Sequence, residues 1–184
     1  ALELLLGMPA RGLALDLITC SVAISTCEKV GLWEQALRLL DESRRSFNPD
    51  RVTCNAAISA CEKGLHWDRA LFLLSIMEQT QLKPDVFTCS AAISACEKCE
   101  QWEYALGMLT EMHEHHLAPD VISFNAAISA WERGAQWEQA LNMLSSMREH
   151  DLEPNGISFR VAGRTCETCE QWERALEMRE RGLE

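Results

Sequence analysis

A unit of about 35 residues recurs along the chain. Five of the six tryptophans recur at intervals of 34, 35, 35 and 35 residues: Trp33, Trp67, Trp102, Trp137 and Trp172. Four prolines keep a strict interval of 35: Pro49, Pro84, Pro119 and Pro154. A fixed period of this length indicates stacked supersecondary units, because each unit can bury its apolar face only against its neighbours.

Each unit has the pattern of two helices. In the unit that begins at Arg51, apolar residues recur twice with the spacing i, i+3, i+4, i+7: first Cys54, Ala57, Ile58 and Cys61, then Trp67, Ala70, Leu71 and Leu74. We expect these eight side chains to face the core, Gly64 to break the first helix, and Lys83-Pro84 to end the second. No segment alternates with period two for long, so the sequence predicts an all-α fold.

The period divides the chain into units. We expect complete units at residues 17–50, 51–85, 86–120 and 121–155. Residues 1–16 then form the second helix and tail of a truncated unit. Residues 156–184 form a degenerate or truncated unit, because Gly163 and Arg179 replace the Ile and Leu of the other units. Since the chain also begins with Ala and shows no leader, it is expected to be a fragment or a processed chain.

Charge and composition limit the functions open to the chain. A formal net charge of −11 repels nucleic acid at long range, so RNA binding would have to depend on local geometry. Nine cysteines, an odd number, favour buried thiols in a reducing compartment. No apolar run approaches the ~20 residues that span a membrane.

The repeated phrases resemble the pentatricopeptide repeat. The matching segments are PDVFTCSAAISACEKCEQWEYALGMLTEMHEHHLAPD (Pro84–Asp120) and PDVISFNAAISAWERGAQWEQALNMLSSMREHDLEPN (Pro119–Asn155). The resemblance implies an α-solenoid of helix-turn-helix repeats that forms a right-handed superhelix. It also implies binding of single-stranded RNA, at roughly one base per repeat, in chloroplasts or mitochondria.

The resemblance implies several rows of RNA-contacting residues. The fifth and the last residue of each repeat select the base. The fifth residues are Ser21, Asn55, Ser90, Asn125 and, in the last unit, Arg160. The last residues are Asp50, Asp85, Asp120 and Asn155, with Asp16 before them. Aliphatic second residues sandwich the base: Ile18, Val52, Ile122 and Ile157, with Phe87 as an aromatic exception. Cations at position thirteen contact phosphate: Lys29, Lys63, Lys98 and Arg133, while Thr168 breaks this row.

These rows also have structural interpretations. The Ser and Asn side chains could bond to a neighbouring hairpin instead of a base edge. Asp and Asn before a helix are preferred N-caps, and capping is compatible with base contact.

The resemblance also implies a target sequence. With the family's base preferences, the four complete units imply the target G-U-G-C/U.

Other candidate sites receive structural interpretations. The pairs Cys96/Cys99 and Cys166/Cys169 lie two repeats apart, too far for one zinc ion, so we expect buried thiols, with a local redox role as the alternative. His113, His115 and His116 fit a solvated helix end. The recurring tryptophans could stack on bases, but their place at the start of each apolar stripe favours core packing.

The sequence therefore predicts sequence-selective binding of single-stranded RNA in organellar RNA processing, stabilisation or translation. We expect no catalysis, cofactor, metal, membrane or small-molecule substrate. The alternative is a protein-binding scaffold. It is favoured by the net charge of −11 and by self-neutralising pairs such as Glu62/Lys63.

Overall fold

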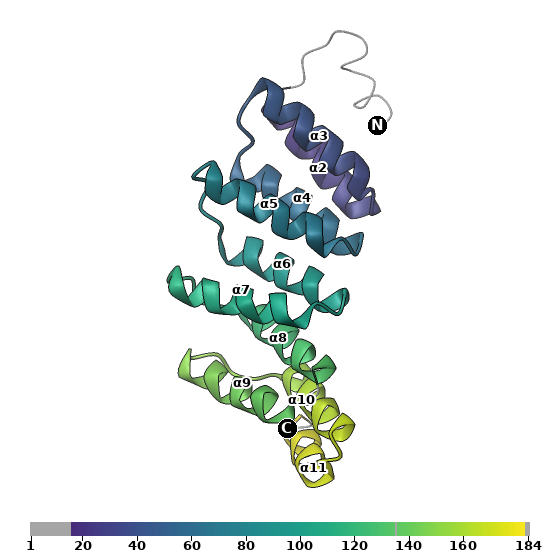
Figure 1. The fold of residues 1–184 in the computed structure, drawn as a ribbon, viewed down its shortest axis with the longest axis vertical. Helices are drawn as coiled ribbons and strands as arrows, with labels where there is room; N and C mark the ends of the chain where they lie inside the picture. Colours follow the sequence, from purple (N-terminus) through teal and green to yellow (C-terminus); the bar gives the residue numbers. More distant parts are fainter. Residues whose placement is uncertain (1–15, 135, 183–184) are drawn as a thin grey trace. The chain divides into compact units, whose positions relative to one another are not determined.

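The fold is all-α. The computed structural model describes residues 16–134 and 136–182, and in this part of the chain ten helices follow one another (Figure 1). They alternate as first and second helices of successive pairs. Their bounds are α2 Leu17–Val30, α3 Trp33–Ser46, α4 Arg51–Lys63, α5 Trp67–Gln79, α6 Val86–Lys98, α7 Trp102–Glu114, α8 Val121–Arg133, α9 Trp137–Glu149, α10 Gly156–Thr168 and α11 Trp172–Arg181. The predicted all-α fold of helix-turn-helix repeats is confirmed. The truncated unit predicted at 1–16 lies, apart from Asp16, outside the described residues.

The first helix of each pair begins at a side-chain cap. At the start of α4, Asp50 has an extended backbone and its Oδ1 accepts a 2.9 Å hydrogen bond from the Thr53 N–H. The same bond to the third helical residue is made by Asp16, Asp85, Asp120 and Asn155. A cap of this kind satisfies one of the backbone donors that a helix start leaves open.

The second helices end earlier than the prolines predict. Helix α5 ends at Gln79, because the Leu82 N–H donates a 2.8 Å bond to the Met77 carbonyl while Gln81 takes a left-handed conformation (φ 59°). This closure lies before Pro84, so the expected end at Lys83-Pro84 is wrong by four residues. The equivalent bond follows α7 and α9, from Leu117 to Met112 and from Leu152 to Met147.

Helix α4 ends at Lys63 with Gly64 as its C-cap, as expected, but this glycine is not required for its backbone conformation. Its backbone is right-handed (φ −80°), and the left-handed residue of this turn is Leu65 (φ 61°). A Cβ at Gly64 would lie 2.5 Å from Trp33 Cδ1, on the preceding helix pair. Glycine is therefore required here for space, because the indole of one pair packs against the turn of the next.

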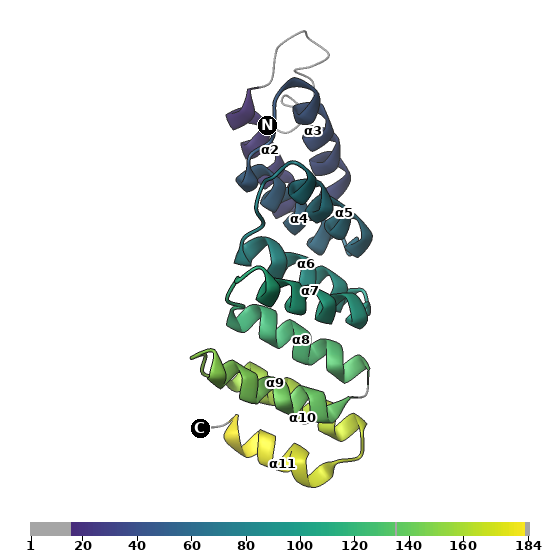
Figure 2. The ribbon, with the colours of Figure 1, turned by 60° about the vertical axis from the view of Figure 1, so that its left-hand side comes forward.

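Contacts divide the chain into two compact units, one up to Ala95 and one from Cys96, with the boundary inside α6. In the N-terminal unit, α4 packs against α2, α3 and α5, and its core includes Ile24, Ile58 and Met77. In the C-terminal unit, α8 packs against α7, α9 and α10, and α10 also packs against α11 (Figure 2). The core of that unit includes Phe124, Ile128 and Met147.

The apolar stripes are placed nearly as predicted. In the pair α4–α5, six of the expected residues are buried: Cys54, Ala57, Ile58, Cys61, Ala70 and Leu74. Leu71 and Trp67 are only half-buried, so their assignment to the core is wrong. The buried face of α5 runs through Ala70, Leu73, Leu74 and Met77, which leaves Leu71 at its edge.

The half-buried tryptophans pack between successive pairs. In the N-terminal unit Trp33 lies against His66, with ring centroids 3.7 Å apart. In the C-terminal unit Trp102 lies against Trp131, at 6.2 Å. Trp131 stands at the position that Cys27, Cys61, Cys96 and Cys166 fill in the other pairs. These indoles support the stacking of repeats, although they are not the centre of the core.

Replacing glycine by alanine should have opposite effects on stability at Gly64 and at Gly107. Gly64→Ala should destabilise the fold by about 1–3 kcal/mol, because the new methyl group meets the Trp33 indole. Gly107→Ala is the matched control. Gly107 lies within α7 with nothing within 4 Å of its Cβ position, so alanine should stabilise by about 0.5–1 kcal/mol. Urea unfolding of both variants measures the difference, and equal effects would refute the packing of Trp33 on Gly64.

Candidate nucleic-acid interface

A row of apolar side chains is exposed at the start of the first helices. It consists of the second residue of each helix: Ile18, Val52, Phe87, Ile122 and Ile157. Their exposed fractions lie between 49% and 74%. The residues at the fourth helical position are buried: Cys20, Cys54, Cys89, Phe124 and Phe159. Exposure is therefore specific to the second position and does not extend over the whole start of the helix. The structure thus leaves five branched or aromatic side chains open to solvent at equivalent places.

The two proposed base-selecting residues of one repeat lie together. Asn55 Nδ2 donates to Asp85 Oδ1 at 3.3 Å, although the residues are 30 positions apart in sequence. Both contact Thr88, the third residue of α6. The Thr88 hydroxyl lies 2.6 Å from Asn55 Oδ1 and 2.8 Å from Asp85 Oδ1. Asn55 is half-buried and Thr88 is fully buried.

A similar arrangement is present at Ser21 and at Asn125. In the N-terminal unit, the Ser21 hydroxyl lies 2.5 Å from that of Thr53, which lies 2.6 Å from Asp50 Oδ1. In the C-terminal unit, the Ser158 hydroxyl lies 2.6 Å from Asn125 Oδ1 and 3.1 Å from Asn155 Oδ1. Each contact joins the fifth residue of one repeat to the first helix of the next. The bond to a neighbouring hairpin that we considered for the Ser and Asn row is therefore present.

The third residue of each first helix is a site residue that the sequence reasoning missed. All five are hydroxyl residues, at Thr19, Thr53, Thr88, Ser123 and Ser158. The last four are fully buried. Their periodicity is as regular as that of the tryptophans and would have revealed them. They were overlooked because a hydroxyl near a helix start is ordinarily taken for a part of the cap.

The fifth residues are not all alike. Ser90 is buried, and its hydroxyl donates to the Val86 carbonyl at 2.7 Å, as the Ser21 hydroxyl does to the Leu17 carbonyl at 2.9 Å. Arg160 is exposed and replaces the small polar group with a long cation. The last residues Asp50, Asp85, Asp120 and Asn155 are all caps, as the structural interpretation predicted.

The Asp85 carboxylate is stabilised in its charged form. Burial raises its pKa, but hydrogen bonds from the Thr88 N–H and hydroxyl and from Asn55, together with the charge of Arg51, outweigh burial. The pKa of Asp85 therefore lies below its ordinary value, and near neutral pH the group only accepts hydrogen bonds. Arg51 Nε lies 3.2 Å from Asp85 Oδ2.

The cations proposed to contact phosphate are partly neutralised. Lys63 Nζ lies 2.8 Å from Glu28 Oε1 of the preceding repeat. Lys29 and Lys98 are exposed, while the side chain of Arg133 lies outside the described part of the structure. In the C-terminal unit, Arg164 pairs with Glu132, which precedes Arg133. A phosphate at Lys63 would have to compete with a carboxylate.

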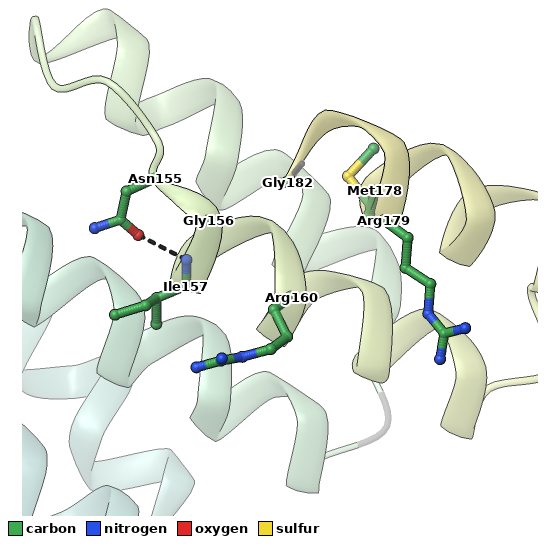
Figure 3. A pocket seen from close by; sticks show the side chains of 7 residues that line it. All are labelled: Asn155, Gly156, Ile157, Arg160, Met178, Arg179 and Gly182. Carbon is green, nitrogen blue, oxygen red and sulfur yellow. Dashed lines mark hydrogen bonds between the residues drawn. The ribbon is translucent and has the colours of Figure 1, made fainter. Parts of the chain in front are cut away.

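A cavity of about 710 Å³ lies beside the last two helices (Figure 3). Its lining includes three residues of the proposed rows: Asn155, Ile157 and Arg160. Arg179 also lines it, but its guanidinium points away from that of Arg160 and pairs with Glu167. The two cations therefore do not converge on a single anion.

Most cysteines are buried, as expected for structural thiols. Seven of the nine are buried, whereas the second cysteine of each Cys-x-x-Cys pair, Cys99 and Cys169, is only half-buried. Burial raises the pKa of the Cys61 and Cys96 thiols to about 12 and that of Cys54 to about 11. Such thiols stay protonated and are poor nucleophiles, which disfavours the redox alternative for Cys96/Cys99.

Metal and membrane sites were also considered. Within residues 16–134 and 136–182, no group of three or more His, Cys, Asp and Glu side chains is arranged to hold a metal ion. His115 and His116 are exposed after α7, and the His113 ring lies 6.1 Å from that of His150. None of the described helices combines the length and the hydropathy needed to cross a bilayer.

Comparison with known families identifies the repeats. The pentatricopeptide repeat domain matches residues 72–133, and the PPR repeat matches residues 18–46, 52–80 and 122–152. Together these matches span residues 18–46 and 52–152, more than half of the chain. A search of curated proteins finds no significant match.

Solved structures share the fold. The pentatricopeptide repeat protein PPR10 in complex with an 18-nt psaJ RNA element superimposes with a TM-score of 0.77 at 23% identity, over 96% of this chain and 26% of that one. PPR10 from maize gives a TM-score of 0.75 at 25% identity, over 91% and 24%. The PPR domain of Arabidopsis thaliana protein-only RNase P 1, in complex with tRNA, gives 0.75 at 19% identity, over 86% and 84%.

The chain spans about a quarter of the length of PPR10. The agreement in fold extends over nearly the whole chain, and the sequence matches cover most of the helix pairs. The chain therefore belongs to the pentatricopeptide repeat family.

Proposed function

We propose that this chain binds single-stranded RNA with sequence selectivity, at roughly one base per repeat. The fifth and last residues of each repeat select the base, and the second residues of adjacent first helices sandwich it. The segment binds and does not catalyse. It acts in RNA processing, stabilisation or translation in a chloroplast or mitochondrion, where the family typically works.

The exposed second-residue row carries this proposal. Large apolar side chains at equivalent, solvent-open positions of five helices offer flat or branched surfaces to a ligand with the same period. Bases are such a ligand, because every base has a π-face that packs on aromatic or aliphatic groups. Each member of the row lies three residues before a fifth residue, so a base held by Val52 is close to the start of the helix that presents Asn55.

The polar pair beside the row supports base selection. Asn55 and Asp85 present an amide and a carboxylate side by side, and both remain partly accessible. Groups of this kind can hydrogen-bond the Watson–Crick edge of an unpaired base. Under the family's preferences, the units closed by Asp50, Asp85, Asp120 and Asn155 favour G, U, G and C or U in turn.

One observation favours a protein-binding scaffold instead. The net charge is −11, and Lys63 is already bound to Glu28. A basic protein ligand would be attracted to such a surface, whereas RNA would be repelled at long range. Retention of short RNA motifs from a random pool supports RNA binding, and no retention of RNA or single-stranded DNA supports the scaffold.

The sandwich row can be tested with two phenylalanines. Phe87 and Phe72 are exposed to 57% and 55%, but only Phe87 belongs to the row. Phe87→Ala should weaken RNA binding by about 5- to 150-fold, the value of one base stacked on a side chain. Phe72→Ala, on α5, should leave affinity unchanged, and both variants should melt near the wild-type temperature. Equal affinities in filter binding would contradict a base contact at Phe87.

The base code can be tested at the second complete unit. Asn55→Thr replaces the amide by a hydroxyl and gives the Thr/Asp pair, which in the family prefers G. We expect the preference at the second base to move from U to G, with other bases unaffected. The measurement is the affinity of the full-length protein for RNAs that vary at that base. Asn142→Thr, on the exposed face of α9, is the control. An equal loss for every RNA would mean that Asn55 has only a structural role.

Salt dependence reports the phosphate contacts. If about four phosphates are contacted, the logarithm of the binding constant should fall with the logarithm of salt concentration at a slope near −3. Lys98→Ala should make this slope less steep. A slope near zero in titrations between low and moderate salt would exclude phosphate contacts by the position-thirteen row.

A further inference from the structure

The hydroxyl of Thr88 lies between the two base-selecting side chains of the preceding repeat. It is fully buried. It accepts a 3.1 Å hydrogen bond from the Asp85 N–H and has a single proton to donate, either to Asn55 Oδ1 at 2.6 Å or to Asp85 Oδ1 at 2.8 Å. Thr88 belongs to α6, whereas Asn55 belongs to α4. The next repeat therefore supplies a contact to the fifth residue of this one.

This contact orients the Asn55 amide. Its oxygen faces the Thr88 hydroxyl, and its nitrogen donates to Asp85 at 3.3 Å. A flipped amide would place its oxygen against the Asp85 carboxylate, where two acceptors repel each other. In the observed orientation the amide nitrogen keeps a second proton for a base. That proton can be donated to a carbonyl oxygen, such as O4 of uracil, but not to the amino group at C4 of cytosine.

We propose that the third residue of each first helix is a positioning residue that sets the base preference of the preceding repeat. Thr88 does this for Asn55, and Ser158 does it for Asn125. Base choice then depends on the fifth and last residues of one repeat and on the hydroxyl that the next repeat places behind them. The inference rests on the proposed RNA-binding function.

The recurrence of the arrangement supports a shared role. Ser158 lies 2.6 Å from Asn125 Oδ1, the distance that separates Thr88 from Asn55 Oδ1. Both hydroxyls are fully buried and both also contact the cap residue. Capping requires only the bond from the helix backbone, so it does not explain why a buried hydroxyl points to the amide of another repeat.

The experiment compares valine and serine at position 88 in the full-length protein. Thr88→Val keeps the shape but removes the hydroxyl, so the Asn55 amide loses one of the two bonds that orient it. The preference for U over C at the second base should fall by about 10-fold, the value of one hydrogen bond. Thr88→Ser restores the hydroxyl and should keep the preference. The readout is the ratio of affinities for two RNAs that differ only at that base.

Thr165→Val is the matched control. Thr165 is also fully buried, but its hydroxyl donates to the Val161 carbonyl of its own helix. Loss of that hydroxyl should leave the U-to-C ratio unchanged. If Thr88→Val does not fold, Ser158→Ala tests the same inference at Asn125, where the base ratio of the fourth complete unit should change.

An RNA-free readout separates this inference from the proposed function. In NMR spectra of the RNA-free protein, the side-chain amide protons of Asn55 should exchange slowly with solvent in the wild type and in Thr88→Ser, and faster in Thr88→Val. RNA binding with an unchanged U-to-C ratio in Thr88→Val would overturn the inference alone. An equal loss for both RNAs would also overturn it, because a purely structural role predicts that result. A wild-type protein that binds no RNA would refute the proposed function.

Discussion

The start of each first helix holds the interaction on which the rest of the structure depends. There, the last residue of one repeat caps the next helix, as Asp85 does for the Thr88 N–H. The buried Thr88 hydroxyl must also find partners, because an unsatisfied buried polar group costs about 1–3 kcal/mol. It finds them in Asp85 and in Asn55 of the preceding repeat. One small network therefore begins a helix and ties two neighbouring repeats together.

This network explains why structural and functional interpretations of the same residues do not compete. Asp50, Asp85, Asp120 and Asn155 are caps in the structure. A carboxylate has two oxygens, and capping occupies Oδ1 of Asp85 while Oδ2 lies near Arg51. Because both oxygens of Asp85 have partners, the direction of this side chain is fixed. Fixed direction is what recognition of a base edge requires, because a freely rotating group would lose entropy on binding.

Sequence periodicity predicted the repeats, but some details depend on neighbours that no single repeat shows. The spacing of Ile58 and Leu74 placed both in the core, as observed, because helical spacing identifies a buried face. It did not locate the centre of that face, so Leu71 was assigned to the core although it lies at the edge. The role of Gly64 was missed for a similar reason. A glycine after a helix suggests a backbone requirement, whereas here it leaves room for Trp33 of another repeat.

In the candidate site, too, the sequence predicted positions within a repeat but not the contacts between repeats. The positions of Asn55 and Val52 followed from the family's register, but the contact between Asn55 and Thr88 joins residues 33 positions apart. Such a contact depends on how one repeat stacks on the next, which a pattern within one repeat does not contain. In the sequence, the hydroxyl residues Thr53, Thr88 and Ser158 show only that they recur with the repeat. Their contacts with the fifth residue of the preceding repeat are seen only in the stacked helices.

The acidic charge changes what kind of RNA binding this surface can support. Non-specific affinity for nucleic acid comes mostly from cations near phosphates, and here Lys63 and Arg164 are paired with Glu28 and Glu132. With that contribution reduced, the proposed RNA binding would have to come from bases packed on the second-residue row and hydrogen-bonded to the amides of the fifth residues. These contacts act only at short range and only on unpaired bases of the right kind. Under the proposed function, a net charge of −11 would therefore lower the affinity for every RNA alike and leave the differences between bases intact.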